Sequence, residues 1–304
     1  MQVSDPAVLE SNGPLLIACN HPNSFLDAII IATLFKKPVI SLARGDAFKN
    51  KMAFKILRGL NIYPVYRLSE GAGNLQSNYD TFDECRKIFS KNGIVLIFSE
   101  GLCVNEWKLR PLKKGTARLA FSSWQEQIPL KVIPAGINYH SFSEFGKIVK
   151  LNFEKPISIH DLSDTAMSGH AINSFNEILN SRMMQVVDHL DESDTETLRK
   201  YYPIKSKLHR HPLLTIPAFL GKWLHAPLYA PIQKWSWRNF KGRDHYDSVL
   251  LGLLFILYPI YLSLIASIIY LLGGAYYSLL VFIIMPLLAW CHVQWKSAFK
   301  VSSK

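Results

Sequence analysis

The first half of the chain alternates short apolar runs with longer stretches in which apolar residues recur every three or four positions. The short runs have the length of buried β-strands, and the longer stretches have the period of α-helices. The predicted strands are 14–19, 38–42, 62–67, 94–98, 131–137 and 147–153. The predicted helices begin at an Asn23 N-cap, span 48–60 and 76–91, and begin again at Gly115. This order predicts an α/β domain over residues 1–160, with a mixed, largely parallel sheet flanked by helices.

Residues 161–245 are predicted to form a helical extension. Up to about residue 202 the segment is polar and mixes acidic with basic side chains, which is typical of solvated helices. Residues 212–237 are rich in Pro, Leu and Trp, with basic residues beside Trp223, Trp235 and Trp237. Tryptophan next to basic residues favours a membrane interface. An ordinary buried core with surface lysines is the alternative.

The C-terminal part, residues 246–304, has two long apolar runs. Residues 249–272 and 275–295 contain no Asp, Glu, Lys or Arg, and Gly273-Gly274 separates them. Each run is long enough to cross a bilayer, so a two-helix transmembrane hairpin is expected, with core helices of a large protein as the alternative. Basic residues lie outside both ends. They predict an integral membrane protein whose α/β domain lies on the cytoplasmic face.

The composition indicates the kind of partner that the protein binds, and it argues against a disulfide framework and a zinc site. The net charge of +11 predicts an anionic partner, either a phospholipid surface, a phosphorylated substrate or nucleic acid. Nucleic acid is the weakest of these, and we expect none. The four cysteines are dispersed, with neither zinc-ligand spacing nor a disulfide framework, which is typical of a reducing compartment. No metal is expected, and the N-terminus lacks the pattern of a cleaved secretory signal.

His21 and Asp27 are the candidate catalytic residues. His21 follows the first apolar strand and precedes a helix, so rigid elements fix its position while the loop leaves it open to substrate. An imidazole takes a proton from a hydroxyl near neutral pH when a carboxylate holds its other nitrogen. Asp27 is placed to be that carboxylate. The alternative is an ordinary loop histidine, with Asp27 favouring only the positive end of the helix.

The loop before Gly115 carries the cations Lys108, Arg110, Lys113 and Lys114. Cations just before a helix N-terminus are typical of a phosphate-binding site. A solvated basic loop is the alternative.

Four short motifs, in order, resemble the glycerophospholipid acyltransferase family, which includes lysophosphatidic acid and glycerol-3-phosphate acyltransferases. They are Asn20-His21 to Asp27, Gly59 to Arg67, Phe98-Ser99-Glu100-Gly101 and Val132-Ile133-Pro134. The resemblance covers about residues 14–155. Each motif alone is weak evidence, and four at compatible distances are strong evidence.

The resemblance implies a role for each matched position. His21 would be the general base and Asp27 its orienting partner. Arg67, Glu100 and Gly101 would bind a glycerol phosphate acceptor, and Pro134 would shape the acyl-donor side. No metal or cofactor is implied, since acyl-CoA or acyl carrier protein is a co-substrate.

Three departures from the family pattern affect these assignments. Five residues separate His21 from Asp27, where the family usually has four. Ser99 replaces the usual proline, and residues 102–110 replace a customary Thr-Arg, so Arg110 and Lys114 become the candidate phosphate ligands. An N-terminal membrane-associated helix common in the family is also not seen, and the C-terminal hairpin is expected to provide the anchor.

The predicted function is a membrane-anchored O-acyltransferase in phospholipid biosynthesis. The expected acceptor is 1-acylglycerol-3-phosphate, and glycerol-3-phosphate is the alternative. Two other classes remain open: a noncatalytic lipid-binding membrane protein, and a serine hydrolase that uses Ser99. The hydrolase is disfavoured because Ser99 lacks the Gly-x-Ser-x-Gly turn.

Overall fold

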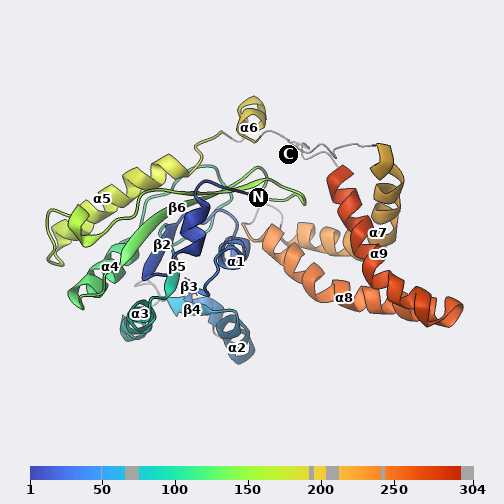
Figure 1. Ribbon diagram of the computed structural model, residues 1–304, viewed down its shortest axis with the longest axis horizontal. Helices are drawn as coiled ribbons and strands as arrows, with labels where there is room; N and C mark the ends of the chain where they lie inside the picture. Colours follow the sequence, from blue (N-terminus) through green and yellow to red (C-terminus); the bar gives the residue numbers. More distant parts are fainter. Residues whose placement is uncertain (49, 66–74, 192–194, 203–211, 241–243, 296–304) are drawn as a thin grey trace. The chain divides into compact units, whose positions relative to one another are not determined.

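The computed structural model describes residues 1–48, 50–65, 75–191, 195–202, 212–240 and 244–295 (Figure 1). The chain divides into two units. The first unit comprises Met1–Tyr139 and Val149–Asp191, and the second comprises His140–Ile148 and Glu192–Lys304. Each unit has its own packing.

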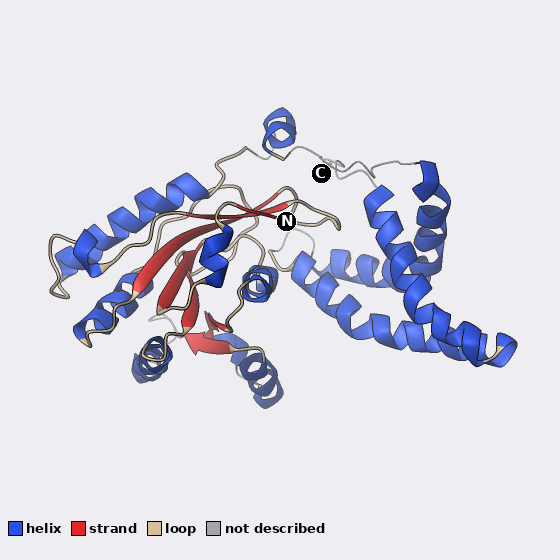
Figure 2. Cartoon of the chain, viewed as in Figure 1, coloured by secondary structure: helices blue, strands red, loops and turns tan. Residues whose placement is uncertain are grey.

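The first unit contains a seven-stranded sheet in the order β1-β7-β6-β2-β5-β3-β4. Its strands are the red arrows of Figure 2. β6 and β7 pair antiparallel, and every other neighbouring pair is parallel. This confirms the predicted mixed, largely parallel sheet. The strands are β1 Gln2–Val3, β2 Leu15–Cys19, β3 Val39–Arg44, β4 Ile62–Val65, β5 Ile94–Phe98, β6 Lys131–Tyr139 and β7 Val149–Phe153.

Helices cover both faces of this sheet, which explains why its central strands are apolar throughout. Leu16 and Ala18 of β2 pack with α3, α4 and α5 in one core, and α1 lies on the other side of the sheet (Figure 1). All five residues of β2 are buried. The helices are α1 Phe25–Leu34, α2 Lys51–Gly59, α3 Leu75–Phe89, α4 Gly115–Gln125 and α5 Gly169–Val186, with 3₁₀ turns η1 Pro6–Glu10, η2 Gly45–Phe48 and η5 Ile159–Asp161.

The boundary between the units differs from the predicted boundary at residue 160. α5 belongs to the first unit because its apolar face is part of the same core as α4. Phe175, Leu179 and Met183 of α5 are fully buried, and the Phe175 ring packs against those of Phe121 and Trp124. The helix predicted to be a solvated extension therefore closes one face of the sheet.

The second unit is helical, with α6 Thr195–Tyr201, α7 Pro212–Phe240, α8 Tyr246–Gly273 and α9 Ala275–Trp295. α7 and α9 approach closely at Gly221, where an added Cβ would lie 2.1 Å from the Leu288 carbonyl oxygen. Lys147 and Asp247 form a largely buried ion pair. α8 and α9 match the two predicted runs and are long and apolar enough to cross a membrane.

Candidate active site

Parallel pairing of β2 with β5 brings two of the predicted motifs together. Cys19 and Phe98 are register partners at the ends of these strands, and His21 and Glu100 each lie two residues further along. The Glu100 Oε2 atom accepts a hydrogen bond from the His21 backbone N–H at 3.0 Å. The site therefore lies at the carboxyl end of neighbouring parallel strands, where open α/β sheets bind ligands.

The predicted contact between His21 and Asp27 is confirmed. His21 Nδ1 lies 2.8 Å from Asp27 Oδ2, and the Asp27 side chain is fully buried. The His21 ring stacks on Phe98 with centroids 3.8 Å apart and keeps one fifth of its side chain exposed. With Nδ1 directed at the carboxylate, Nε2 is the nitrogen that can take a proton from a substrate hydroxyl.

A turn at Ser24 lies between His21 and Asp27. Ser24 has φ 53° and ψ −135°, a positive φ that is uncommon for a residue with a side chain. α1 starts at Phe25, so Ser24 occupies the N-cap position predicted for Asn23. The Asn23 backbone N–H instead donates to Asp27 Oδ2 at 2.8 Å. The first turn of α1 thus delivers Asp27 to the Nδ1 edge of the imidazole.

Glu100 is buried, and both of its carboxylate oxygens accept backbone N–H groups. Oε2 bonds the His21 N–H, and Oε1 bonds the Arg110 N–H at 2.8 Å. Burial raises the pKa of Glu100, and these two hydrogen bonds offset part of that effect. Glu100 therefore orders the turn that carries His21 and the loop that carries Arg110.

Ser99 is in a position that excludes it as a nucleophile. Its side chain is buried, and its Oγ is hydrogen-bonded to Thr116 Oγ1 at 2.9 Å. A nucleophilic serine needs a basic partner and access to substrate. The contact with Thr116 instead ties the end of β5 to the start of α4, which argues against the hydrolase alternative.

Residues 1–138 match the sequence model of the family described as Acyltransferase. These residues are similar to the acyltransferase family. The match confirms the family indicated by the four motifs. Among solved structures, the chain is similar to the crystal structure of the 1-acyl-sn-glycerophosphate (LPA) acyltransferase PlsC from Thermotoga maritima. The two are 15% identical with a TM-score of 0.41, over 60% of this chain and 70% of that chain. A comparison with curated proteins finds no match.

The cations of the acyltransferase domain differ in their surroundings. The Arg110 guanidinium pairs with Glu106, and Lys108 lies 3.1 Å from the same carboxylate. Burial acts to raise the pKa of Glu106, but the bonds from Arg110 and Lys108 outweigh it, so this pKa is lowered. Lys114 is exposed at the N-cap of α4.

The other positions assigned by resemblance lie in different parts of the first unit or outside the described residues. Gly101 takes a positive φ of 63° in the turn after Glu100. Pro134 lies in the middle of β6, opposite Ala18 of β2. Arg67 lies outside the described residues. The binding roles of Arg67, Glu100, Gly101, Arg110 and Lys114 stay predictions.

Two residues that sequence reasoning did not single out complete the site. The Asn20 side chain bonds the Ile137 backbone in both directions, accepting from its N–H at 2.8 Å and donating to its carbonyl at 3.1 Å. The Tyr139 hydroxyl donates to Asp27 Oδ1 at 2.7 Å. Asn20 lies inside the first motif, so the motif could have indicated it. No local pattern indicates Tyr139, which is 112 positions from Asp27.

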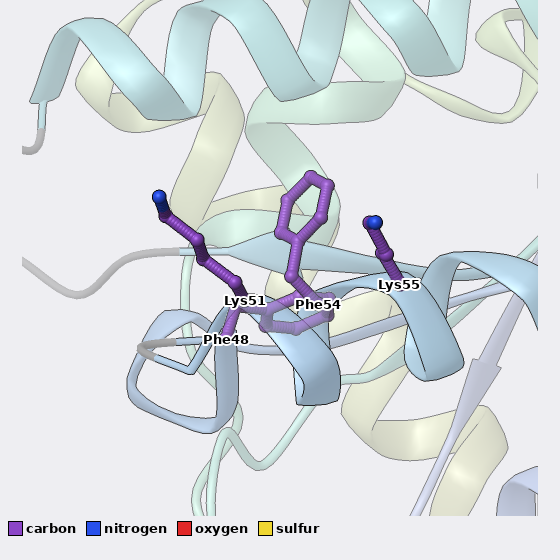
Figure 3. A pocket seen from close by; sticks show the side chains of 4 residues that line it. All are labelled: Phe48, Lys51, Phe54 and Lys55. Carbon is purple, nitrogen blue, oxygen red and sulfur yellow. The ribbon is translucent and has the colours of Figure 1, made fainter.

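Within the described ranges, no group of three His, Cys, Asp or Glu side chains is placed to hold a metal ion. A hollow of about 350 Å³ lies on α2 and the preceding turn, lined by Phe48, Lys51, Phe54 and Lys55 (Figure 3). Phe54 is 43% exposed between the two lysines. This helix carries Lys51, Lys55 and Arg58 and has no acidic residue.

Proposed function

We propose that the protein is a membrane-anchored O-acyltransferase that transfers a fatty acyl group to 1-acylglycerol-3-phosphate. The observation that carries this proposal is the 2.8 Å contact between His21 and a fully buried Asp27 in an acyltransferase-family domain. The acyl donor is a thioester, either acyl-CoA or acyl carrier protein. Acylation of this acceptor is a step of phospholipid biosynthesis.

The chemistry follows from the geometry of His21. Nε2 takes the proton of the acceptor hydroxyl while Asp27 holds Nδ1 and stabilises the imidazolium. The hydroxyl oxygen attacks the thioester carbonyl carbon, which forms a tetrahedral oxyanion. When this intermediate collapses, the carbon–sulfur bond breaks, and the thiolate leaves with the proton from the imidazolium. His21 returns to its neutral form, and no covalent enzyme intermediate is required.

The phosphate of the acceptor needs cations near this centre. Lys114 and Arg67 are our candidates, with Arg110 as a third whose guanidinium would exchange Glu106 for phosphate. The same cations suit glycerol-3-phosphate, so the phosphate group alone does not choose between the two acceptors. The membrane helices favour the lipid acceptor, because an enzyme held at a bilayer meets 1-acylglycerol-3-phosphate in the same surface.

Anchoring at the membrane rests on α8 and α9. In each helix, only 17% of the most apolar window is buried against protein, so lipid is the solvent that such a surface suits. The basic residues flanking the hairpin lead us to place both of its ends, and the acyltransferase domain, on the cytoplasmic face.

A direct assay tests the proposal. Full-length protein purified in detergent is given radiolabelled acyl-CoA of several chain lengths, or acyl carrier protein thioesters, with each of the two acceptors. We expect transfer to 1-acylglycerol-3-phosphate and a large loss in His21→Ala. Transfer to glycerol-3-phosphate alone would mean that glycerol-3-phosphate, and not 1-acylglycerol-3-phosphate, is the acceptor. If the protein transfers nothing from any donor to either acceptor but still binds lipid vesicles, the noncatalytic alternative would take its place.

A further inference from the structure

The Asp27 carboxylate is held from a strand that contributes no residue to the His21 motif. Its Oδ2 atom contacts His21 Nδ1 and the Asn23 backbone N–H, both from the same loop. Its Oδ1 atom accepts the Tyr139 hydroxyl, from the end of β6. We propose that Tyr139 is a positioning residue for acyl transfer, which fixes Asp27 in the orientation that His21 requires. This inference rests on the proposed function of the His21 site.

The backbone of β6 is held tightly near Tyr139. Asn20, the residue before His21, bonds both the N–H and the carbonyl of Ile137. Tyr139 lies two residues further along the strand, so its side chain emerges on the same face as that of Ile137. The Tyr139 carbonyl accepts the Trp107 indole N–H at 2.5 Å, and the Trp107 carbonyl accepts the Leu190 N–H at 3.0 Å. These hydrogen bonds fix the backbone from which the Tyr139 phenol reaches Asp27.

The Tyr139 hydroxyl has a specific physical effect on Asp27. A carboxylate with no solvent exposure must be stabilised by donors, and a carboxylate with only one oxygen anchored can rotate about its Cβ–Cγ bond. The Tyr139 hydroxyl occupies Oδ1 and leaves Oδ2 for the imidazole. Without it, Oδ1 would lose a charge-assisted bond in a buried site, and the carboxylate could turn away from Nδ1.

The other titratable groups next to this pair do not replace Tyr139. Glu100 uses its two oxygens for the backbone N–H groups of His21 and Arg110. The Cys19 thiol is buried near Asp27, and burial together with the Asp27 charge raises its pKa, which keeps it protonated. Tyr139 also lies one position beyond the stretch that matches the family, so that match does not assign it a role.

A double-mutant cycle tests whether Tyr139 acts through Asp27. Steady-state rates are measured for the unmodified protein, Tyr139→Phe, Asp27→Asn and the double variant. We expect Tyr139→Phe to lower kcat about 10-fold with KM unchanged, the low end for loss of a bond to a buried charge. In the Asp27→Asn background, the same change should have no further effect. Tyr202→Phe, which removes a hydroxyl from an equally buried ring of the second unit, is the control expected to keep full activity.

Two outcomes would overturn the inference. An equal loss of kcat in the presence and absence of the Asp27 carboxylate would show that Tyr139 acts on general packing. A Tyr139→Phe variant that keeps its full kcat would show that the hydroxyl has no role in catalysis.

A second readout separates this inference from the proposed function. Carbethoxylation of His21 by diethyl pyrocarbonate, followed by peptide mass spectrometry, reports imidazole reactivity without any acyl acceptor. Tyr139→Phe should slow the modification of His21 severalfold. The modification rate of the solvent-exposed His170 should stay unchanged. If the unmodified protein transfers no acyl group but Tyr139→Phe still slows the modification of His21, the proposed function fails and the positioning role stands. An unchanged His21 rate contradicts the positioning role itself.

Discussion

The two units of this protein differ in the exposure of their apolar side chains. In β2 of the first unit, Leu16 and Ile17 have no exposed surface. In α8 of the second unit, Phe255 is 81% exposed and Ile260 is 62% exposed. The first unit also buries the polar side chains of Asp27 and Glu100 and gives each of their carboxylate oxygens a donor. The first unit is therefore built as a water-soluble fold with a polar site, and the second suits an apolar solvent.

His21→Ala tests the chemical side of this comparison and should have the largest effect. Removing a general base lowers rates by about 10²-fold to 10⁴-fold, so acyl transfer should fall by this amount. Membrane retention should stay unchanged, because the second unit is untouched. Acyl transfer and flotation on vesicles are measured on the same preparation. Full activity in this variant would mean that another group is the base.

Matched lysine substitutions test the two environments directly. Ile17→Lys places a charge inside the sheet, where it should prevent folding of the first unit and abolish activity. Ile260→Lys places a charge on the exposed surface of α8. If that surface faced water, the charge would cost little. In a bilayer it costs about 2.5–3.5 kcal/mol, so the fraction of protein that resists carbonate extraction should fall. Unchanged extraction of Ile260→Lys would contradict a membrane position for α8.

The sequence could predict the parts of the site that depend on local order. His21 and Asp27 are close in the chain, and the strand before them and helix after them follow from apolar periodicity. The Glu100 turn follows in the same way from the end of β5. Tyr139 could not be predicted, because its contact with Asp27 depends on how β6 pairs with β2, a long-range register that one sequence does not state.

Two local predictions needed correction for physical reasons. Asn23 has the side chain of an N-cap, but its backbone N–H bonds Asp27, which moves the cap to Ser24. The segment after residue 161 is mostly polar, yet Phe175, Leu179 and Met183 recur at helical spacing and are fully buried. Composition averaged over a segment conceals such a stripe, whereas its period reveals it.

Glu100→Gln tests how much the hydrogen bonds to the buried Glu100 carboxylate stabilise the first unit. The amide keeps one acceptor but turns an N–H₂ group toward a backbone N–H, which should cost about 1–3 kcal/mol of unfolding free energy. The pH dependence carries a further signature. Because burial raises the pKa of Glu100, its stabilising contribution is present at low pH and is lost as the pH rises through that raised pKa.

The measurement is the difference in thermal midpoint between the unmodified protein and Glu100→Gln across pH. The glutamine does not titrate, so the unmodified protein should gain relative to the variant as the pH is lowered from neutrality. A difference that does not vary with pH, or that shrinks on acidification, would contradict the burial of an ionisable carboxyl at this position.

The smallest expected effect concerns the turn at Ser24, between His21 and Asp27. Ser24 holds a positive φ, which is unfavourable for any residue with a Cβ. Ser24→Gly should therefore be more stable than Ser24→Ala by about 1 kcal/mol, and it should keep acyl transfer because the backbone N–H that bonds Cys103 Sγ is retained. Chemical unfolding of the two variants measures this difference. Equal stabilities would mean that the turn relaxes, and the His21–Asp27 spacing would then be set by α1 and by Tyr139 rather than by the connection.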